Sequence, residues 1–271
     1  MKNIDFTHLK KTMEDSIEEN LLFKNLARKC LMVDDIEDKS TVLKYGIDSK
    51  KPIVRWLSSN FGEEASFMEI SENEVLLYPF QNSYIFEVSF FEDNETLNTY
   101  NTTLFDVTSF FRKRETKLFV DLVEDASKNN LTYSLECPVE NIQNKIIEAS
   151  KYIEGKNLLL SNIFMNKVTF EKIEKHLTID IFDKSTIEVI AERLNIQGHI
   201  FSSDIMCYDE IRGNKIYLTP SPDFFGVLPV RQKVSVLSND ILHNNKCKFA
   251  AYNEIGMGIL YPEYIVEINV K

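Results

Sequence analysis

Glycine and proline are scarce in this chain of 271 residues, which contains only 8 Gly and 7 Pro. Long disordered linkers are rich in these residues, so the composition argues against them. No apolar run approaches the roughly 20 residues that cross a bilayer. The first residues lead into a charged amphipathic stretch and lack the apolar core of a signal peptide. We therefore expect a folded protein without membrane contact that is made and used inside a cell.

Sequence motifs that carry chemistry are missing as well. The four histidines are isolated from one another, and His243 with Cys247 supplies only two ligands, which do not make a metal site. No Ser lies in a Gly-x-Ser-x-Gly elbow, and Gly256-Met257-Gly258 is only a fragment of a phosphate-binding loop. We expect no enzyme and no catalytic, cofactor or metal site. A site assembled from distant carboxylates stays open.

Cysteine is sparse and scattered over the chain. Cys30, Cys137, Cys207 and Cys247 lie far apart, without the close pairs that bind zinc or do redox chemistry. In a protein used inside a cell, they are predicted to be reduced, partly buried thiols.

Positive charge is in deficit, since the net charge is −11 at pH 7. Proteins whose main task is to grip phosphates need clustered Lys and Arg, so this balance weighs against such a task. It does not exclude a container for DNA, because a shell should not adhere strongly to its contents.

Helical patterns dominate two segments. The apolar spacing predicts a helix over residues 7–30 with Thr7 as its N-cap. That helix either docks on its own subunit or forms an arm on a neighbour. A stronger pattern over residues 102–128 would run about 37 Å and suits a structural spine. Its Arg112-Lys113-Arg114 cluster is interpreted as a solvated face paired with Glu115, Asp121 and Glu124, with nucleic-acid contact as the alternative.

Strand-like patterns fill most of the remaining chain. Residues 34–38 predict a solvated acidic turn, and residues 41–94 predict a long β-hairpin or small antiparallel sheet that must pack on something. After a boundary near Pro138, the predicted elements alternate. They are a helix that ends at Gly155, a strand over 158–165, a short helix capped by Thr169, a helix over 185–194 and a strand over 199–208.

The last third of the chain carries the most specific pattern. A strand over 214–220 runs into a Pro turn, and a closing strand covers 264–270. Between them stand two segments, Gly226-Val227-Leu228-Pro229-Val230-Arg231 and Glu254-Ile255-Gly256-Met257-Gly258-Ile259. In this order, the segments resemble the end of the major capsid proteins of tailed double-stranded-DNA phages, which have the Hong Kong 97-type capsid fold.

Five residues of these segments are predicted to form structural turns. They are Gly226, Pro229, Arg231, Gly256 and Gly258. Gly226 and Gly256 fit tight backbone turns where a side chain would clash. Pro229 is expected to end a strand, because it lacks the N–H donor.

The resemblance implies an α+β fold divided along the whole chain. The implied segments are an N-terminal arm over residues 1–41, an E-loop hairpin over 42–92, a peripheral domain with a long spine helix over 93–138, an axial α/β domain over 139–250, and a return to the peripheral domain over 251–271.

The resemblance also implies a function. Subunits would self-assemble as hexamers and pentamers of an icosahedral shell that encloses packaged double-stranded DNA without sequence-specific binding. Besides further copies of the chain, its expected partners are portal, scaffolding and decoration or head-completion proteins. Its expected place is the virion capsid, assembled in the host cytoplasm. The alternatives are an encapsulin-type cellular compartment and a small cytoplasmic α/β enzyme.

Overall fold

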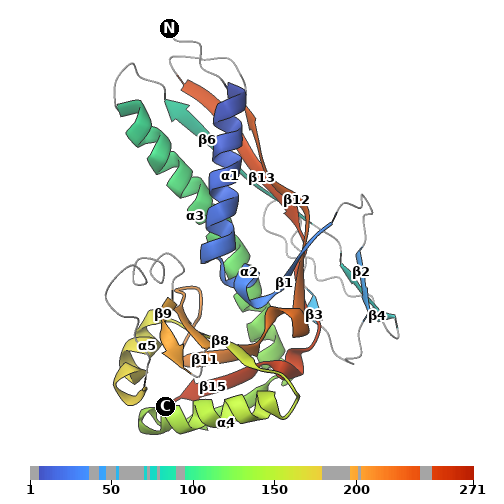
Figure 1. Ribbon diagram of the computed structural model, residues 1–271, viewed down its shortest axis with the longest axis vertical. Helices are drawn as coiled ribbons and strands as arrows, with labels where there is room; N and C mark the ends of the chain where they lie inside the picture. The colour runs from blue at the N-terminus through green and yellow to red at the C-terminus, as the bar shows by residue number, and fades with distance from the viewer. Residues whose placement is uncertain are drawn as a thin grey trace.

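The computed structural model describes residues 6–36, 43–46, 53–54, 70–71, 74–77, 80–89, 95–178, 196–200, 203–238 and 246–271. Helices and strands are mixed along these ranges, as the predicted α+β class requires. The molecule is elongated and consists of two parts, each built on its own sheet (Figure 1). None of its described helices is both long and apolar enough to span a bilayer.

The first part is a long sheet covered on one face by two helices, α1 (Phe6–Lys24) and α3 (Glu95–Lys128) (Figure 1). Its main strands, in their order across the sheet, are β3 (Ile53–Val54), β14 (Gly258–Ile259), β12 (Gly226–Ser238), β13 (Lys246–Ile255) and β6 (Phe80–Ser89). A further strand, β1 (Met32–Asp35), pairs in parallel with the start of β12. Side chains alternate between the faces of each strand, so Phe86, Val236 and Phe249 point under the helices and are buried there.

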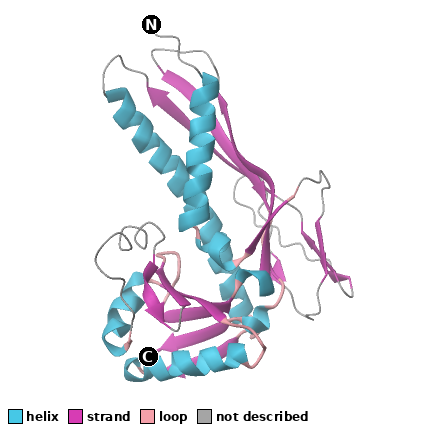
Figure 2. Cartoon of the chain, viewed as in Figure 1, coloured by secondary structure: helices cyan, strands magenta, loops and turns pink. Residues whose placement is uncertain are grey.

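The second part is a mixed sheet with two shorter helices, α4 (Ile142–Glu154) and α5 (Lys167–Ile173), beside it (Figure 2). Its strands, in their order across the sheet, are β7 (Tyr133–Cys137), β15 (Val266–Val270), β11 (Lys215–Pro220), β8 (Leu160–Met165), β10 (Ser203–Cys207) and β9 (Ile196–Ile200). Short 3-10 turns occur at Val139–Asn141, Glu174–His176, Pro222–Phe224 and Pro262–Tyr264. The helix expected to end at Gly155 is confirmed. The strand expected over 158–165 is confirmed from Leu160 to Met165.

One helix joins the two parts. With 34 residues, α3 is about 51 Å long, because it begins at Glu95 and not near residue 102 as predicted. Its first half packs on the long sheet. In its second half, the Phe119 ring lies 5.7 Å from the Phe164 ring of β8, so the same helix enters the core above the second sheet.

The predicted hairpin over residues 41–94 is only partly right. Three strands, β2 (Leu43–Gly46), β5 (Glu74–Leu77) and β4 (Ile70–Ser71), form a small sheet of their own. In contrast, β6 pairs along ten residues with β13, more than 150 positions later in the chain. Its apolar side chains, Phe86 and Val88, can be buried under α1 and α3 only in that pairing, and a local hairpin would leave them exposed.

The first predicted helix is interrupted. It begins at Phe6, which rules out Thr7 as its N-cap, and it ends at Lys24. Asn25 then caps a second helix, α2 (Leu26–Cys30), by accepting a hydrogen bond from the backbone N–H of Ala27. Because the apolar face of α1 is buried in the core of its own subunit, the docked interpretation of this helix is confirmed for the described residues.

Two further local predictions are wrong. Asp34 and Asp35 belong to β1 and pair with Pro229 and Val230, so they do not form a turn. The N-cap of α5 is Asn166, whose side chain accepts a hydrogen bond from the Thr169 N–H at 2.7 Å.

Other predictions fall partly or wholly outside the description. The strand expected over 199–208 is two strands, β9 and β10, which pair with each other. The helix expected over 185–194 lies outside the described residues, as do Glu37 and Asp38.

The strand pairing also departs from the expected division of the chain. Strands β12 and β13, expected in the axial domain, belong to the long sheet with β6. The closing strand β15, expected to return to the peripheral domain, lies between β7 and β11 in the second sheet. Sequence order alone does not say which sheet a strand joins, because strand partners are set by long-range burial.

Candidate functional site

A buried polar cluster, called here the polar hub, ties the elements of the first part together. It consists of Glu18 of α1, Asn25 between α1 and α2, Arg28 of α2, Glu115 of α3 and Asn253 of β13. The carboxylate of Glu115 is fully buried and accepts hydrogen bonds from Asn25 Nδ2 at 2.6 Å and Asn253 Nδ2 at 3.0 Å. Buried carboxylates need such donors, because burial removes their water.

Arg28 supplies the positive charge of the polar hub. Its Nε and Nη2 bind the two oxygens of Glu115 at 2.9 and 3.1 Å, and its Nη1 binds Glu18 at 2.9 Å. Burial alone would lower the pKa of Arg28, but the charges and hydrogen bonds of Glu115 and Glu18 outweigh burial and raise it. The two-point contact with Glu115 also fixes the orientation of the guanidinium. The polar hub is therefore a charged hydrogen-bond network that links α1, α2, α3 and β13.

A second polar feature lies where the two parts of the molecule meet. Side chains in register across four strands form a row on one face of the second sheet, and they are Thr219, Asn162, Asp204 and His199. Lys29 of α2 interacts electrostatically with Asp204. Burial lowers the pKa of Lys29 to about 8, and the charge of Asp204 opposes that shift. This contact supports the junction of α2 with the second sheet.

The cysteines have the surroundings of inert thiols. All four are free, and only Cys207 is partly exposed. Burial raises the pKa of both Cys30 and Cys207 to about 12. A thiol with so high a pKa carries almost no thiolate at neutral pH and is a poor nucleophile. In the described part of the chain, no three His, Cys, Asp or Glu residues gather as a metal site would require.

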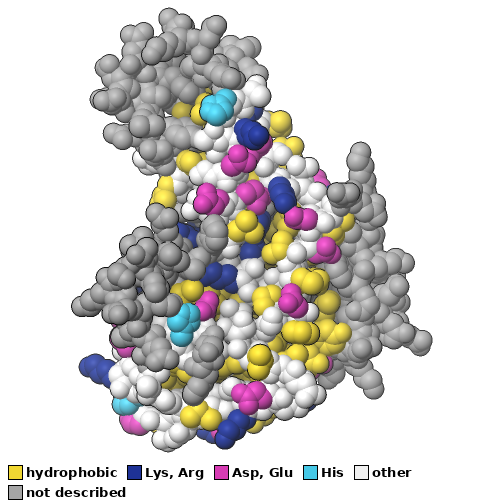
Figure 3. Space-filling model, viewed as in Figure 1, with side chains coloured by type: hydrophobic (Ala, Val, Ile, Leu, Met, Phe, Trp, Pro, Cys, Tyr) yellow, Lys and Arg dark blue, Asp and Glu magenta, His cyan; other side chains and the backbone are white. Residues whose placement is uncertain are grey.

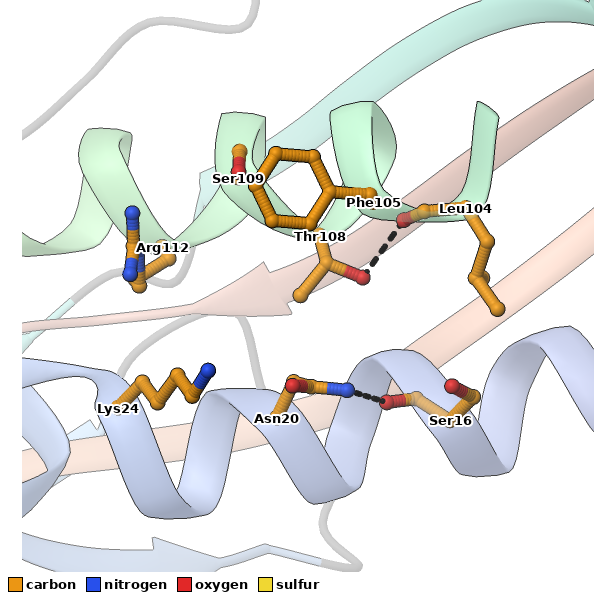
Figure 4. A pocket seen from close by; sticks show the side chains of 8 residues that line it. All are labelled: Ser16, Asn20, Lys24, Leu104, Phe105, Thr108, Ser109 and Arg112. Atoms are coloured by element: carbon orange, nitrogen blue, oxygen red, sulfur yellow. Dashed lines mark hydrogen bonds between the residues drawn. The ribbon is translucent and has the colours of Figure 1, made fainter. Parts of the chain in front are cut away.

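A shallow groove of about 210 Å³ separates α1 from α3. Its lining residues are Ser16, Asn20 and Lys24 of α1 and Leu104, Phe105, Thr108, Ser109 and Arg112 of α3 (Figure 4). Lys24 and Arg112 lie at the same end of the groove, and neither forms an ion pair with a described carboxylate. This end of the groove therefore carries two cations that have no carboxylate partner among the described residues.

The expected pairing of the Arg112-Lys113-Arg114 cluster with Glu115 is wrong. Glu115 stands four positions after Phe111, so it shares the buried face of α3 and points into the polar hub. Arg114 instead lies 5.9 Å from the ring centre of Phe110, and Arg112 lines the groove. Acidic and basic side chains are interspersed along the face shown in Figure 3, which has no large basic patch.

The outer face of the long sheet carries an exposed apolar row. Ala250 of β13 is paired with Ile85 of β6 on one side and with Leu237 of β12 on the other. Residues directly opposite one another in a sheet share a face. Ile85 is 74% exposed and Leu237 is 58% exposed. These three residues are the apolar row named below.

The predicted turn residues lie close together but have different roles. Gly226 begins β12 and opposes Ile259 of β14, while Gly256 lies between β13 and β14 and donates its N–H to the Pro229 carbonyl at 2.8 Å. Arg231 faces Glu254 of β13 at 3.6 Å.

The prediction for Pro229 is wrong, because β12 continues through it to Ser238. A proline is tolerated there since the partner of β12 changes from β14 to β13 at this point, with register irregularities on the β13 side. Gly258, the last of the five residues, begins β14.

Gly226 is required because other segments of the same chain approach its backbone closely. A Cβ at this position would lie 2.7 Å from the Gly258 carbonyl oxygen and would also strike the Leu31 side chain. We expect Gly226→Ala to lower the free energy of unfolding by about 1 to 3 kcal/mol, as overpacking does. The measurement is the urea midpoint of the full chain. Gly155→Ala is the control, since its nearest neighbour would lie 3.3 Å away, and equal effects of both changes would contradict the argument.

The sequence interpretation missed the polar hub. One signal was available, because Glu115 interrupts an apolar helical face between Phe111 and Phe119. A lone Glu on a buried face needs a cationic partner. The helical pattern did not identify Arg28 as this partner, because it did not reveal the break at Asn25.

Comparison with known proteins finds a likeness in fold but none in sequence. No family profile and no curated protein matches the chain by sequence. By structure, the subunit of a virus-like particle from Pyrococcus furiosus matches with a TM-score of 0.56 and 14% identity, covering 98% of this chain and 100% of that one.

Two further solved structures agree with this match. A chain from Microbacterium phage Oxtober96 matches with a TM-score of 0.58 and 11% identity, over 92% of this chain and 91% of that one. The capsid of Cyanophage P-SCSP1u gives 0.55 and 9%, over 92% and 89%. These likenesses in fold extend over nearly the whole chain, and the chain has the Hong Kong 97-type capsid fold.

Proposed function

We propose that this chain is the major capsid protein of a tailed double-stranded-DNA phage. In this proposal, copies of the chain assemble as hexamers and pentamers of an icosahedral shell. The observation that carries the proposal is the match, over at least 92% of the chain, to subunits described as those of a virus-like particle and of a capsid. Fold likeness alone does not establish function, so the proposal also needs features of this chain.

Three features of the chain support a shell subunit. The polar hub and the long α3 give a stiff, elongated body that can transmit contacts from one neighbour to another. The apolar row offers surface that a neighbouring copy would remove from water. The net charge of −11 suits a wall that does not hold DNA tightly.

Assembly would then proceed through many weak contacts. Each neighbour adds only a modest interface, but a closed shell engages all of them together, which greatly increases the overall stability. The expected partners are further copies of the chain, packaged double-stranded DNA without sequence preference, and portal, scaffolding and decoration or head-completion proteins. The expected location is the virion capsid, with assembly in the host cytoplasm.

A second candidate function is an encapsulin-type compartment that encloses protein. The match to the Pyrococcus furiosus particle covers 98% of this chain and all of the other. A protein shell and a DNA shell make the same structural demands on the subunit, and they differ in their contents.

The experiment that tests the proposal is electron microscopy of the purified full-length chain. Regular hollow shells or capsomer rings are the expected result. Nuclease-protected DNA in particles made during infection would support the phage capsid, whereas a co-purifying protein of fixed stoichiometry would support the compartment. A monomer that never assembles, over a range of salt and crowding conditions, would overturn both.

The apolar row provides a mutational test of assembly. We expect the double change Ile85→Asp and Leu237→Asp to reduce particle yield at least 100-fold. Burial of each apolar side chain in the interface would contribute about 1.5 kcal/mol, and the double change replaces both side chains by charges. Sedimentation of the assembly mixture measures the yield. Ser83→Asp, two residues along the same exposed face of β6, is the matched control and should retain assembly. An unchanged yield in the double variant would exclude the apolar row from the interface.

A further inference from the structure

The groove between α1 and α3 has two cations at one end, one from each wall. Lys24 comes from α1 and Arg112 from α3, and both side chains extend into the space between the helices (Figure 4). These two residues are called here the groove cations. Among the described residues, neither has an ion-pair partner. Like charges in one groove repel each other, so an anion bound between them would lower their energy.

The polar hub holds the two walls together at this end of the groove. Asn25 directly follows Lys24, and Glu115 stands three residues after Arg112 on α3. Asn25 Nδ2 donates a buried hydrogen bond to Glu115 at 2.6 Å. The groove cations are therefore brought near each other by the fold itself, before any ligand binds. A site formed in advance avoids part of the entropy cost of binding.

The carboxylates of the polar hub do not serve the groove cations. Glu115 accepts four hydrogen bonds from other side chains of the hub. Glu18 uses one oxygen for Arg28 at 2.9 Å and the other for the backbone N–H of Val234 at 2.6 Å. Because these oxygens are already engaged inside the subunit, the positive charge in the groove is available to a ligand.

The charge and size of the groove favour a phosphate group as this ligand. A terminal phosphate carries up to about two negative charges and three acceptor oxygens, so it can balance both groove cations, whereas a carboxylate carries one charge. Arg binds phosphate at two points. Ser109 lies three residues before Arg112 and lines the groove, and its hydroxyl can donate to a further oxygen. The groove volume of about 210 Å³ is below the roughly 300 Å³ at which pockets for larger ligands begin.

We propose that Lys24, Arg112 and Ser109 form a binding site for a phosphate group. The phosphate belongs either to a free phosphate compound or to the backbone of a nucleic acid, since both offer the same chemistry. Two cations make a weak contact that salt reduces. Such a contact is compatible with the net charge of −11, which disfavours extended binding of DNA along the subunit. The inference concerns the single subunit and does not require that the shell encloses DNA.

Calorimetric titration of the purified full-length chain tests the site, with inorganic pyrophosphate and a short DNA duplex as the probes. We expect the unchanged chain to bind pyrophosphate. The double change Lys24→Gln and Arg112→Gln should weaken this binding about tenfold or more, because it removes two charge-assisted contacts. Gln keeps part of each aliphatic stem, so the groove walls should stay packed.

The controls separate the groove from the general charge of the surface. Lys113→Gln removes an exposed charge next to Arg112, outside the residues that line the groove, and should leave the affinity for pyrophosphate unchanged. Lys24→Arg keeps the charge and should bind as the unchanged chain does. Circular dichroism checks the fold of each variant, and Lys24→Gln alone replaces the double variant if that one does not fold.

Two results distinguish the sources of the phosphate, and both support the site. Binding of pyrophosphate without the duplex indicates a free phosphate compound. Binding of the duplex indicates a nucleic-acid backbone if the slope of log K against log salt concentration becomes about 0.9 less steep in the double variant, as the loss of one phosphate contact predicts.

Three other results overturn the proposal. The first is that neither probe binds to the unchanged chain. The second is that Lys113→Gln weakens binding as much as the double change does. The third is that a polyglutamate peptide displaces pyrophosphate at equal concentration of charge, which would assign the groove to an acidic protein segment. Electron microscopy scores assembly separately, so shells formed by a chain that binds neither probe would overturn this site and leave the capsid proposal intact.

Discussion

Replacing Glu115 by Gln is expected to lower the free energy of unfolding by about 3 to 5 kcal/mol, the usual cost of breaking a buried ion pair from one side. Glu115 accepts four hydrogen bonds, from Asn25, Asn253 and two nitrogens of Arg28. Gln would leave the buried Arg28 with Glu18 as its remaining anionic partner in the polar hub. It would also turn an amide group toward side chains that can only donate in this geometry.

Urea unfolding of the full chain, followed by circular dichroism, measures this loss. The matched control is Glu148→Gln, because Glu148 pairs with Lys145 at 2.6 Å on the exposed side of α4, where an ion pair contributes little. The control should leave the midpoint unchanged. A second check is the double change Arg28→Met and Glu115→Leu, which removes both charges and should recover much of the lost stability. Equal midpoints for the two Gln variants would contradict the role given to the polar hub.

The change Phe119→Ala is expected to cost about 3 to 5 kcal/mol, the range for a large aromatic removed from a core. Phe119 is fully buried and lies 5.7 Å from the Phe164 ring and 6.4 Å from the Phe225 ring. Phe164 belongs to the second sheet, and Phe225 immediately precedes β12 of the long sheet. The cavity would therefore open at the junction of the two parts.

The position of Phe119 at this junction calls for a second measurement, of hydrogen exchange in both sheets. If α3 couples the two sheets, hydrogen exchange in β8 and in β13 should rise together in the Phe119 variant. The control is Phe105→Ala on the same helix, where the ring is 68% exposed, and its effect should stay within about 0.5 kcal/mol. Faster exchange confined to β8 would show that the two sheets unfold separately.

Local elements were well predicted where a short segment carries its own pattern. In α4, the residues Ile142, Ile146, Ala149 and Ile153 repeat at helical spacing, and all four are buried. In β8, a short apolar run predicted a buried strand, and the strand lies inside the second sheet. Both predictions succeeded because one face of a helix, or a fully apolar strand, is visible within a dozen residues.

Boundaries and caps were predicted less well. The pattern over residues 7–30 continues through Asn25, since apolar residues return at helical spacing after it. Whether Asn25 stays in the helix or caps a new one depends on its partner, Glu115, which lies 90 positions away in the chain. Local propensity cannot contain that information.

The composition and residue pattern of this chain by themselves determined its mixed class, most of its long helix α3, and the strands β11 and β15 that begin and close its last third. They did so because amphipathic periodicity and turn residues act over short distances. Only the tertiary structure decided that β6 pairs with β13, that β15 joins the second sheet, and that Glu115, Arg28 and Asn253 meet. Those contacts join segments far apart in the sequence, and burial selects among them only when the whole chain is folded.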